Sequence, residues 1–354
     1  LFIKNIRLVF GTLLGISSWQ NFRDIAFDIV IVDEAGRATL SELLVPCVKA
    51  RKIVFVGDHK QLAPIIDDEI IKNLNSFTKQ EVTISFFERL FEKLEKSNKD
   101  GIQHLEHFKH RLIYNYRAED RICQLYNQPF YGGELETAKA IEGKREHYLS
   151  IFNSSVVWFD TSKRNDREDE QKGTGKINRC NVLVIEYKLR EILQGMKEKN
   201  IKNSIGIITP YKAQVDLLEK MLGSIKKDFK EYYRHNLDSN QDKDLRNGFD
   251  IGTVDSFQGS DRDIIIYDCV RASKSKNSFE NRNKRKGSKI NFIADEKRLN
   301  VSLSRAKKLL IIVGDIEFLY TASISEGENP FYKIIGYIQK NKELYQIVNA
   351  EEVK

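Results

Sequence analysis

The sequence has few of the residues that mark secreted, fibrous or membrane-spanning proteins. It contains 4 cysteines and 5 prolines in 354 residues, and no two cysteines have C-x-x-C spacing. The cysteines therefore form no zinc site by themselves, and they are typical of reduced thiols in an intracellular protein. With 20 glycines and 41% hydrophobic residues, the composition excludes a collagen-like, mucin-like or wholly disordered chain.

Long apolar runs are also absent. None approaches the roughly 18 residues that cross a bilayer, and no signal-peptide pattern follows Leu1. We therefore expect no membrane partner and an intracellular location, either cytoplasmic or, in a eukaryote, nuclear. The first residue is not methionine, which leads us to expect that the chain is cut from a longer protein.

The length and the net charge of the chain limit its number of domains and its kind of partner. At about 150 residues per domain, 354 residues predict two domains, and such a chain can bury a core without disulfides or a structural metal. The 58 Lys and Arg residues against 51 Asp and Glu residues give a net charge of +7. This excess permits a polyanionic partner without requiring one.

Short runs of apolar residues, rich in Ile and Val, recur along the chain, and most of them end in polar residues. Such runs are typical of parallel strands that are buried on both faces of a sheet. Longer amphipathic stretches, such as 178–199 and 214–229, lie between several of them, and this alternation predicts an α/β protein with parallel sheets. The runs are Ile6–Gly11, Phe27–Val32, Ile53–Val56, Val156–Phe159, Ile205–Ile208, Ile264–Tyr267 and Leu309–Val313.

The strand signals fall into two groups, which predicts domains over residues 1–145 and 146–354. The signals fade through residues 65–135 and resume at Ser155. The polar segment 161–176 is predicted to be a loop. The tail 316–354 has apolar residues at helical spacing, and we expect it to pack against the second domain.

Polar residues at the ends of two strands suggest phosphate chemistry, because ligands of parallel sheets bind at the carboxyl ends of the strands. Asp33 and Glu34 follow the run Phe27–Val32, as in a site where Asp holds Mg²⁺ and Glu polarises a water. Two solvated carboxylates at the start of a loop are the alternative. Gln61 follows the next strand, and its amide can hydrogen-bond both a phosphate and a water.

Two arginines in separate segments complete this pattern. Arg117 follows Asn115-Tyr116, and Arg305 lies just before the final strand. Arginines from different segments can neutralise the charge that develops on a transferring phosphoryl group.

The order of these motifs resembles that of superfamily 1 helicases, in the nonsense-decay/senataxin-like branch (superfamily 1B). The motifs are DEAG, GDHKQLAP, NYR, TPYKAQ, TVDSFQGSDRD and LNVSLSRAK, and the resemblance extends from about residue 6 to residue 315. It implies two RecA-like (P-loop NTPase) domains with parallel sheets, which clamp ATP between them. The first of these domains is expected to be truncated at its amino terminus.

The resemblance also implies a role for each matching residue. Asp33 matches the Mg²⁺ ligand, Glu34 the catalytic base and Gln61 the glutamine that contacts the γ-phosphate. Arg117 and Arg305 match the two arginine fingers.

Two further positions match the part of the family's site that surrounds the nucleotide. Gly259 matches a glycine near the γ-phosphate. Asp261 stands where the family usually has Glu for the nucleotide ribose, and its shorter side chain weakens that assignment.

A second group of residues matches the family's contacts to a single-stranded nucleic acid. Hydroxyls and main-chain amides suit phosphate binding that does not depend on sequence. Thr12 and Thr253 are alternatively plain strand residues, and Tyr211 is alternatively a packed aromatic. The matching residues are Thr12, Thr209, Pro210, Tyr211, Thr253 and Ser256.

One motif of the family is missing. No G-x-x-x-x-G-K-[ST] occurs in the sequence. The tetrapeptide Gly173-Thr174-Gly175-Lys176 lacks the first glycine and is followed by Ile177, so it is predicted to be a polar loop. We expect the P-loop to precede the chain, which by itself would lack the main cradle for the phosphates and would be inactive.

These features predict the motor portion of an ATP-dependent helicase or translocase that uses ATP and Mg²⁺. It would hydrolyse ATP to ADP and phosphate and, by family resemblance, move 5′ to 3′ along RNA or DNA. The alternatives are an ATP-driven switch that does not unwind duplexes and a nucleic-acid-binding module that does not hydrolyse ATP.

Two other features are weaker. His104, His107 and His110 recur every third residue, but no nearby ligands complete a metal site. The basic segment 272–289 is either a nucleic-acid contact or a solvated loop.

Overall fold

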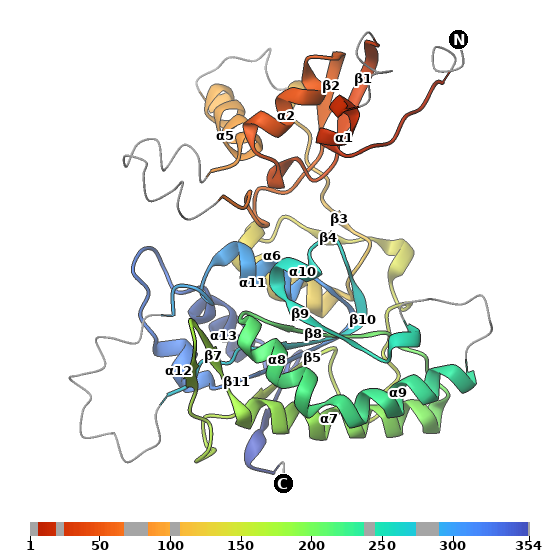
Figure 1. The fold of residues 1–354 in the computed structure, drawn as a ribbon. Helices are drawn as coiled ribbons and strands as arrows, with labels where there is room; N and C mark the ends of the chain where they lie inside the picture. Colours follow the sequence, from red (N-terminus) through yellow and green to blue (C-terminus); the bar gives the residue numbers. More distant parts are fainter. Residues whose placement is uncertain are drawn as a thin grey trace. The chain divides into compact units, whose positions relative to one another are not determined.

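The computed structural model describes residues 6–18, 25–66, 84–99, 107–236, 245–273 and 290–352. The chain divides into two compact units, Leu1–Leu112 and Ile113–Lys354, which are coloured from red to orange and from yellow to blue in Figure 1. This division precedes the predicted one after residue 145. Residues 113–145 therefore belong to the second unit.

The first unit is built around a two-stranded parallel sheet. Strands β1 (Phe27–Val32) and β2 (Ala50–Phe55) pair with Val30 opposite Ile53. The 3₁₀ turn η3 (Ala35–Arg37) follows β1. The helices are α1 (Leu13–Ser18), α2 (Leu40–Cys47) and α5 (Phe86–Lys99).

A capping box explains where α2 begins. The Thr39 hydroxyl accepts a hydrogen bond from the backbone N–H of Glu42 (3.4 Å), and the Glu42 carboxylate accepts one from the N–H of Thr39 (2.8 Å). This arrangement gives partners to two of the amides that every helix leaves unpaired at its amino end.

The core of the first unit is small, and the prediction of strands buried on both faces is wrong here. Ile29 and Ile31 of β1 are 55% and 66% exposed. The run Ile6–Gly11 was also predicted to be a strand, but residues 6–11 form no strand. The buried apolar residues of the cluster are Val32, Ala35, Ala38 and Leu43.

The second unit contains a six-stranded sheet in which every pair of neighbours is parallel. Its order is β12-β5-β11-β10-β8-β9. This confirms the α/β class with a parallel sheet. The sequence runs located β5, β8, β10 and β11, and they missed β9 and β12. The strands are β5 (Val156–Asp160), β8 (Ile205–Thr209), β9 (Asp250–Thr253), β10 (Arg262–Asp268), β11 (Ala306–Gly314) and β12 (Gln346–Asn349).

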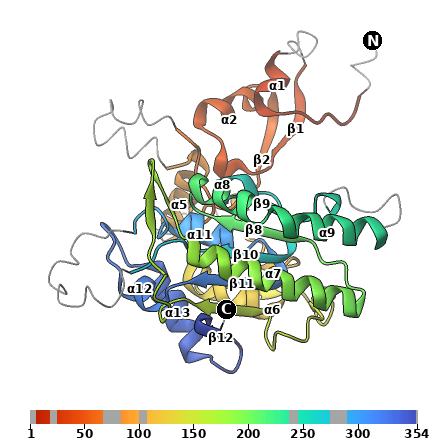
Figure 2. The same cartoon turned by 60° about the horizontal axis from the view of Figure 1, so that its bottom comes forward.

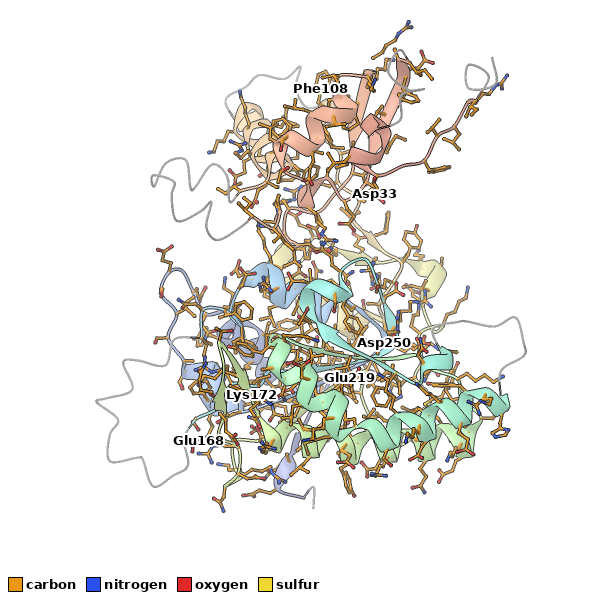
Figure 3. All side chains as sticks on the ribbon, viewed as in Figure 1. Asp33, Phe108, Glu168, Lys172, Glu219 and Asp250 are labelled. Carbon is orange, nitrogen blue, oxygen red and sulfur yellow. The ribbon has the colours of Figure 1, made fainter. Side chains whose placement is uncertain are left out.

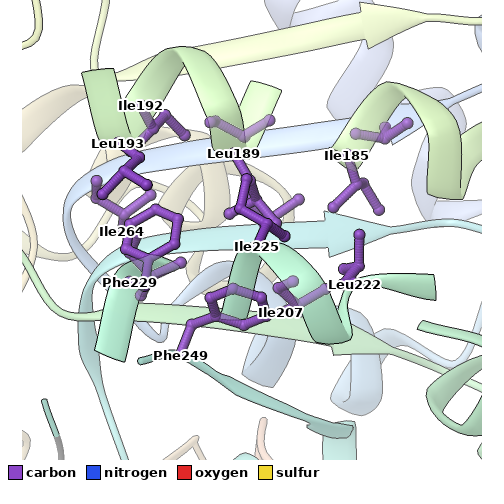
Figure 4. Packing of buried hydrophobic residues seen from close by; sticks show 14 of the residues in the cluster. Ile185, Leu189, Ile192, Leu193, Ile207, Leu222, Ile225, Phe229, Phe249 and Ile264 are labelled. Atoms are coloured by element: carbon purple, nitrogen blue, oxygen red, sulfur yellow. The ribbon is translucent and has the colours of Figure 1, made fainter. Parts of the chain in front are cut away.

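Helices cover both faces of this sheet, as Figures 1 and 2 show. Helices α7 (Arg179–Lys199), α8 (Lys212–Met221) and α9 (Gly223–Asn236) pack together. The stretch 214–229, predicted as one helix, is thus shared between two. Figure 4 shows side chains of α7 and α9 packed against Ile207 and Ile264 of the sheet.

The other face of the sheet is equally buried, because alternate strand residues point to opposite faces. In β11, Leu309 and Ile311 belong to the cluster with α7 and α9, whereas Leu310 and Ile312 do not, yet all four are at most 1% exposed. The predicted burial on both faces is confirmed for this strand.

The segment after residue 112 packs with the second unit through main-chain and side-chain hydrogen bonds. It contains β3 (Tyr114–Asn115), α6 (Asp120–Tyr131) and β4 (Glu136–Thr137). The N–H of Glu119 donates to the carbonyl of Lys307 (2.8 Å), and Asn300 donates to the Tyr131 hydroxyl (2.8 Å). These contacts explain why the first unit ends earlier than the composition suggests.

Two peripheral segments bear on the predictions. The predicted loop 161–176 contains an antiparallel hairpin of β6 (Glu170–Lys172) and β7 (Gly175–Ile177). Its turn includes Gly173 with φ of 59°, so the tetrapeptide 173–176 lies in a hairpin rather than in a strand-to-helix phosphate loop. Near the carboxyl end, α13 (Pro330–Lys340) buries five apolar residues and packs against α6 of the second unit.

All four cysteines are free thiols, and three of them are buried. Burial raises the pKa of Cys180 to about 12. Within the described ranges, no helix is long and apolar enough to cross a membrane.

Candidate functional site

Two carboxylates stand exposed at the carboxyl end of β1. Asp33 and Glu34 are both exposed, and Asp33 is labelled in Figure 3. Glu34 has φ of 55° and ψ of 35°, and its N–H donates to the Asp33 carboxylate (2.9 Å). A left-handed conformation at a residue other than glycine costs on the order of 1 kcal/mol, and such strain gathers at functional sites. The local backbone therefore supports a functional role for this pair.

The loop after β2 holds Gln61 in a defined position. The Gln61 side-chain amide donates to the Asp58 carboxylate (2.8 Å), and the Gln61 N–H donates to the Asp58 carbonyl (3.2 Å). The other carboxylate oxygen of Asp58 accepts from the N–H of Lys60 (2.9 Å). Asp58 thus orients Gln61, and its role was not predicted from the sequence.

The loops after β1 and β2 touch backbone to backbone. The N–H of Ala35 donates to the Val56 carbonyl (2.9 Å). A Cβ atom on Gly57 would lie 3.0 Å from the nitrogen of Gly36, and one on Gly36 would lie 3.1 Å from the Asp58 carbonyl oxygen. Both positions therefore need glycine, and the structure brings the two carboxylates and Gln61 to the same edge of the sheet.

In the second unit, a turn after β3 presents Arg117. The Asn115 side chain builds this turn, since its oxygen accepts from the N–H of Arg117 (3.0 Å) and its amide donates to the Ala118 carbonyl (2.7 Å). The Arg117 guanidinium donates to the carbonyl of Ser304 (3.3 Å). It also forms an ion pair with Asp261 (3.3 Å), so the structure brings two of the predicted site residues together.

Asp261 is bound by two cations. Its second oxygen lies 2.6 Å from the ammonium of Lys307. Although burial by itself would raise the pKa of Asp261, the contacts with Lys307 and Arg117 lower it below its ordinary value. The ion pair of Lys307 with Asp261 was not predicted from the sequence. The one sequence signal was that Lys307 directly follows Arg305-Ala306 in the last motif.

Arg305, the second predicted arginine finger, lies inside the second unit. It is 1% exposed. Its guanidinium donates to the carbonyl of Val301 (3.1 Å) and to the hydroxyl of Ser304 (3.0 Å). In this conformation its charge is directed at the end of helix α11 (Glu296–Leu303).

The segment before Asp261 includes a left-handed glycine and a buried amide. Gly259 has φ of 78°, with open space where a Cβ would stand. Gln258 is 8% exposed, and neither polar atom of its side chain has a hydrogen-bond partner in the part of the chain that the structure describes. A buried amide without partners is costly, and it suits a site that a polar ligand completes.

Two of the predicted nucleic-acid contacts are buried. Thr209 ends β8 opposite Thr253 of β9, and both Thr209 and Pro210 are buried. The Thr209 hydroxyl has no hydrogen-bond partner in the described ranges. Tyr211 is partly buried and stacks on Phe292, with 5.3 Å between the ring centroids. This agrees with the alternative interpretation of Tyr211 as a packed aromatic.

The remaining predicted contacts lie at helix starts. Thr12 is exposed and accepts a hydrogen bond from the N–H of Gly15 (3.0 Å), which places it at the beginning of α1. Thr253 precedes the short helix α10 (Val254–Phe257), and the exposed Ser256 donates to the Thr253 carbonyl (2.7 Å). Thr253 is also the last residue of β9, as the strand alternative expects, whereas Thr12 lies in no strand.

A dedicated metal site requires several ligating side chains close together. Among the described residues, no group of three or more His, Cys, Asp and Glu side chains could hold a metal ion. His107 and His110 are exposed, and His104 lies outside the described residues, as does most of the basic segment 272–289. Mg²⁺ usually binds one or two carboxylates, water and substrate phosphates, and the exposed Asp33 fits that donor set.

Comparison with known proteins identifies the family of this chain. A family model described as an AAA domain matches residues 83–317, and a second AAA-domain model matches residues 1–69. The chain is 30% identical over 301 residues to ATP-dependent helicase NAM7 of Saccharomyces cerevisiae, covering 82% of this chain and 26% of the relative. It is 32% identical over 335 residues to the probable helicase senataxin of Mus musculus, covering 93% of this chain and 11% of the relative.

Solved structures give a weaker likeness. A complex of Arterivirus nonstructural protein 10, a helicase, with DNA has a TM-score of 0.35 and 12% identity, covering 82% of this chain and 40% of that one. The chain thus spans well under half the length of these relatives. On the family matches, the chain belongs to the AAA-domain family of ATP-dependent helicases, in the senataxin-like branch of superfamily 1.

Proposed function

We propose that the intact protein hydrolyses ATP to ADP and phosphate and uses this reaction to move 5′ to 3′ along a single nucleic-acid strand. The observation that carries the proposal is the meeting of Asp33, Glu34 and Gln61 at one edge of a parallel sheet, with Glu34 in a left-handed conformation. Carboxylates and an amide at the carboxyl ends of adjacent strands are the groups that this chemistry requires.

Each residue contributes a separate step. Asp33 would hold Mg²⁺, which neutralises charge on the phosphates of ATP when bound. Glu34 accepts a proton from the attacking water, and its exposure allows water to reach it. Gln61, held by Asp58, orients that water or the terminal phosphate.

The second unit supplies positive charge. The Arg117 guanidinium would compensate the charge that builds on the phosphoryl oxygens. Arg305 acts in the same way once a conformational change releases it from the carbonyl of Val301 and the hydroxyl of Ser304. The unpartnered Gln258 amide beside Gly259 supports a polar ligand such as a nucleotide at this segment.

The partner is proposed to be single-stranded RNA or DNA, and the protein is proposed to be intracellular. Exposed Thr12 and Ser256 and partly exposed Thr253 and Tyr211 are suited to contact a phosphate backbone or a base. Thr209 and Pro210 are buried, so their contribution would be to shape the start of α8.

The test is ATP hydrolysis by the intact protein with and without single-stranded RNA and single-stranded DNA. We expect at least one polymer to stimulate turnover. Absence of stimulation by either polymer would contradict the motor function. A strand-displacement assay on a duplex with a 5′ overhang then tests unwinding, because hydrolysis without displacement indicates an ATP-driven switch.

A further inference from the structure

Asp261 joins three segments of the second unit. It lies in the loop before β10, Arg117 lies in the turn after β3, and Lys307 lies at the start of β11. One carboxylate oxygen is 2.6 Å from the Lys307 ammonium, and the other is 3.3 Å from Nε of Arg117. Both oxygens of Asp261 are therefore engaged by cations of the chain itself.

These contacts fix the guanidinium of Arg117 at two nitrogens. Nε faces Asp261, and Nη1 donates to the carbonyl of Ser304 (3.3 Å). A guanidinium is planar and carries five N–H groups in a rigid fork. The contacts at Nε and at Nη1 set its orientation from two directions, and its side chain stays 37% exposed, so the remaining N–H groups are available to an anion.

The backbone holds the three segments in register. The N–H of Glu119 donates to the carbonyl of Lys307 (2.8 Å), and the N–H of Arg262 donates to the carbonyl of Arg305 (3.1 Å). The backbone near Arg117, Asp261 and Lys307 is thus fixed by hydrogen bonds at these residues or within two residues of them. Two cations and one carboxylate leave a net charge of +1, which favours an approaching anion over a cation.

We propose that Asp261 is a positioning residue that orients Arg117 for phosphoryl transfer. This rests on the proposed ATP hydrolysis, and it replaces the contact with the nucleotide ribose that the family resemblance implies at this position. A ribose hydroxyl would have to compete with Lys307 and Arg117 for oxygens that both cations already occupy.

The first test compares Asp261→Asn with Asp261→Glu in the intact protein. We expect Asp261→Asn to lower kcat for ATP hydrolysis by about 10- to 100-fold, because a misplaced catalytic group costs rate more than binding. KM for ATP should change by less than about 2-fold. Asp261→Glu keeps the charge and should recover most of kcat.

A matched control is available on the neighbouring residue. Asp250, labelled in Figure 3, forms an ion pair with Arg262 at 2.7 Å. Asp250→Asn also removes an ion pair between a carboxylate and an arginine, and it should leave kcat unchanged. An equal loss of kcat in Asp250→Asn would show that the effect of Asp261→Asn is merely structural, and it would overturn the proposal.

Nucleotide analogues separate positioning from ribose binding. If Asp261 acts through Arg117, the ratio of kcat/KM for ATP to that for 3′-deoxyATP and for 2′-deoxyATP is the same in the native protein and in Asp261→Asn. A ribose contact would instead raise KM for ATP in the variant and remove the discrimination. Adding Asp261→Asn to Arg117→Ala should cost no further rate, since the group that Asp261 orients is gone.

A final measurement needs no turnover. Phenylglyoxal modifies arginines, and mass spectrometry of the peptides gives the rate at Arg117. We expect this rate to rise several-fold in Asp261→Asn and to stay unchanged in Asp250→Asn. An unchanged rate in Asp261→Asn overturns the proposal. If the native protein fails to hydrolyse ATP, the proposed function fails, and the labelling rates still decide whether Asp261 holds Arg117.

Discussion

Strands of similar sequence have opposite surroundings in the two units. β1 reads FDIVIV and β10 reads RDIIIYD, yet Ile31 of β1 is 66% exposed while Ile266 of β10 is fully buried. In the described part of the chain, β1 pairs with β2 alone, whereas β10 lies between β8 and β11 under helices on both faces. An apolar run therefore predicts a strand, and the number of its neighbours determines its burial.

The acids that close the strands differ in the same way. Asp33 and Glu34 are exposed after β1. Asp268 at the end of β10 is fully buried and accepts hydrogen bonds from Asn181 (2.7 Å), Gln214 (2.6 Å) and the N–H of Val270 (2.9 Å). The first unit leaves its strand-end carboxylates exposed to solvent, and the second buries one that links three segments by hydrogen bonds.

The largest expected effect is on catalysis at the exposed edge. Glu34→Gln should lower kcat for ATP hydrolysis by about 10²- to 10⁴-fold, because the amide cannot accept the proton of the attacking water. ATP binding and thermal stability should remain close to native, since Glu34 is exposed. Steady-state kinetics measures kcat, titration calorimetry measures ATP binding, and thermal denaturation measures stability.

The control for this variant lies on the same strand. Asp28 is exposed and lies 3.6 Å from Arg51, so Asp28→Asn should leave turnover unchanged. Normal turnover by Glu34→Gln would show that the assignment of the base is wrong.

A pair of matched truncations tests the difference in burial directly. Ile266→Ala should reduce the free energy of unfolding by about 2–5 kcal/mol, since it leaves a cavity between packed layers. In the same 354-residue chain, Ile31→Ala in β1 should reduce it by less than about 0.5 kcal/mol, since Ile31 is 66% exposed there. Urea denaturation followed by hydrogen exchange in each unit measures both. Equal losses would contradict the contrast between the two sheets.

The buried acid should make the second unit sensitive to pH. Burial raises the pKa of Asp268 from 3.8 to about 6, although its hydrogen bonds oppose this shift. A carboxyl whose pKa is higher in the folded state stabilises the fold when protonated. Its contribution is complete below about pH 3.8 and is lost as pH rises through about 6, on the order of 2–3 kcal/mol in total.

The measurement is the difference in stability between the native protein and Asp268→Asn over this pH range. The native protein should lose stability relative to the variant between about pH 4 and 6, because asparagine does not titrate. A difference that is independent of pH would show that Asp268 does not carry this effect.

The smallest expected effect concerns a helix cap in the first unit. Thr39→Ala removes one half of the capping box of α2 and should cost about 1 kcal/mol of local stability. Thr39→Ser keeps the hydroxyl and should behave like the native protein. Hydrogen exchange of the α2 amides reports this change, and equal exchange in Thr39→Ala would refute the role of the cap.

Much of the fold follows from local sequence. The runs at Phe27–Val32 and Leu309–Val313 lie in strands, and the helix predicted over 178–199 begins after its Asn178 cap. β9 and β12 were missed because they are only four residues long and lack a continuous apolar run. The strand signal at Ile6–Gly11 failed because an apolar run needs a hydrogen-bonded neighbour to become a strand.

The sequence predicted which residues to consider for the candidate site. It did not predict what those residues contact or how exposed they are. The motif order located Asp33, Glu34, Gln61 and Arg117. It gave no sign that Arg305 is buried beside Ser304, or that Lys307 shares the carboxylate of Asp261 with Arg117. These contacts join residues that are far apart in the chain, so no local pattern contains them.

The sequence by itself determined the α/β class, the order of most strands and helices, and the family, because apolar periodicity and motif order are local properties of the chain. Only the tertiary structure decided which strand-end acids face solvent, where the first compact unit ends, and which arginine forms an ion pair with Asp261. Exposure and ion pairing depend on neighbours that the chain supplies from distant segments, and folding brings those segments together.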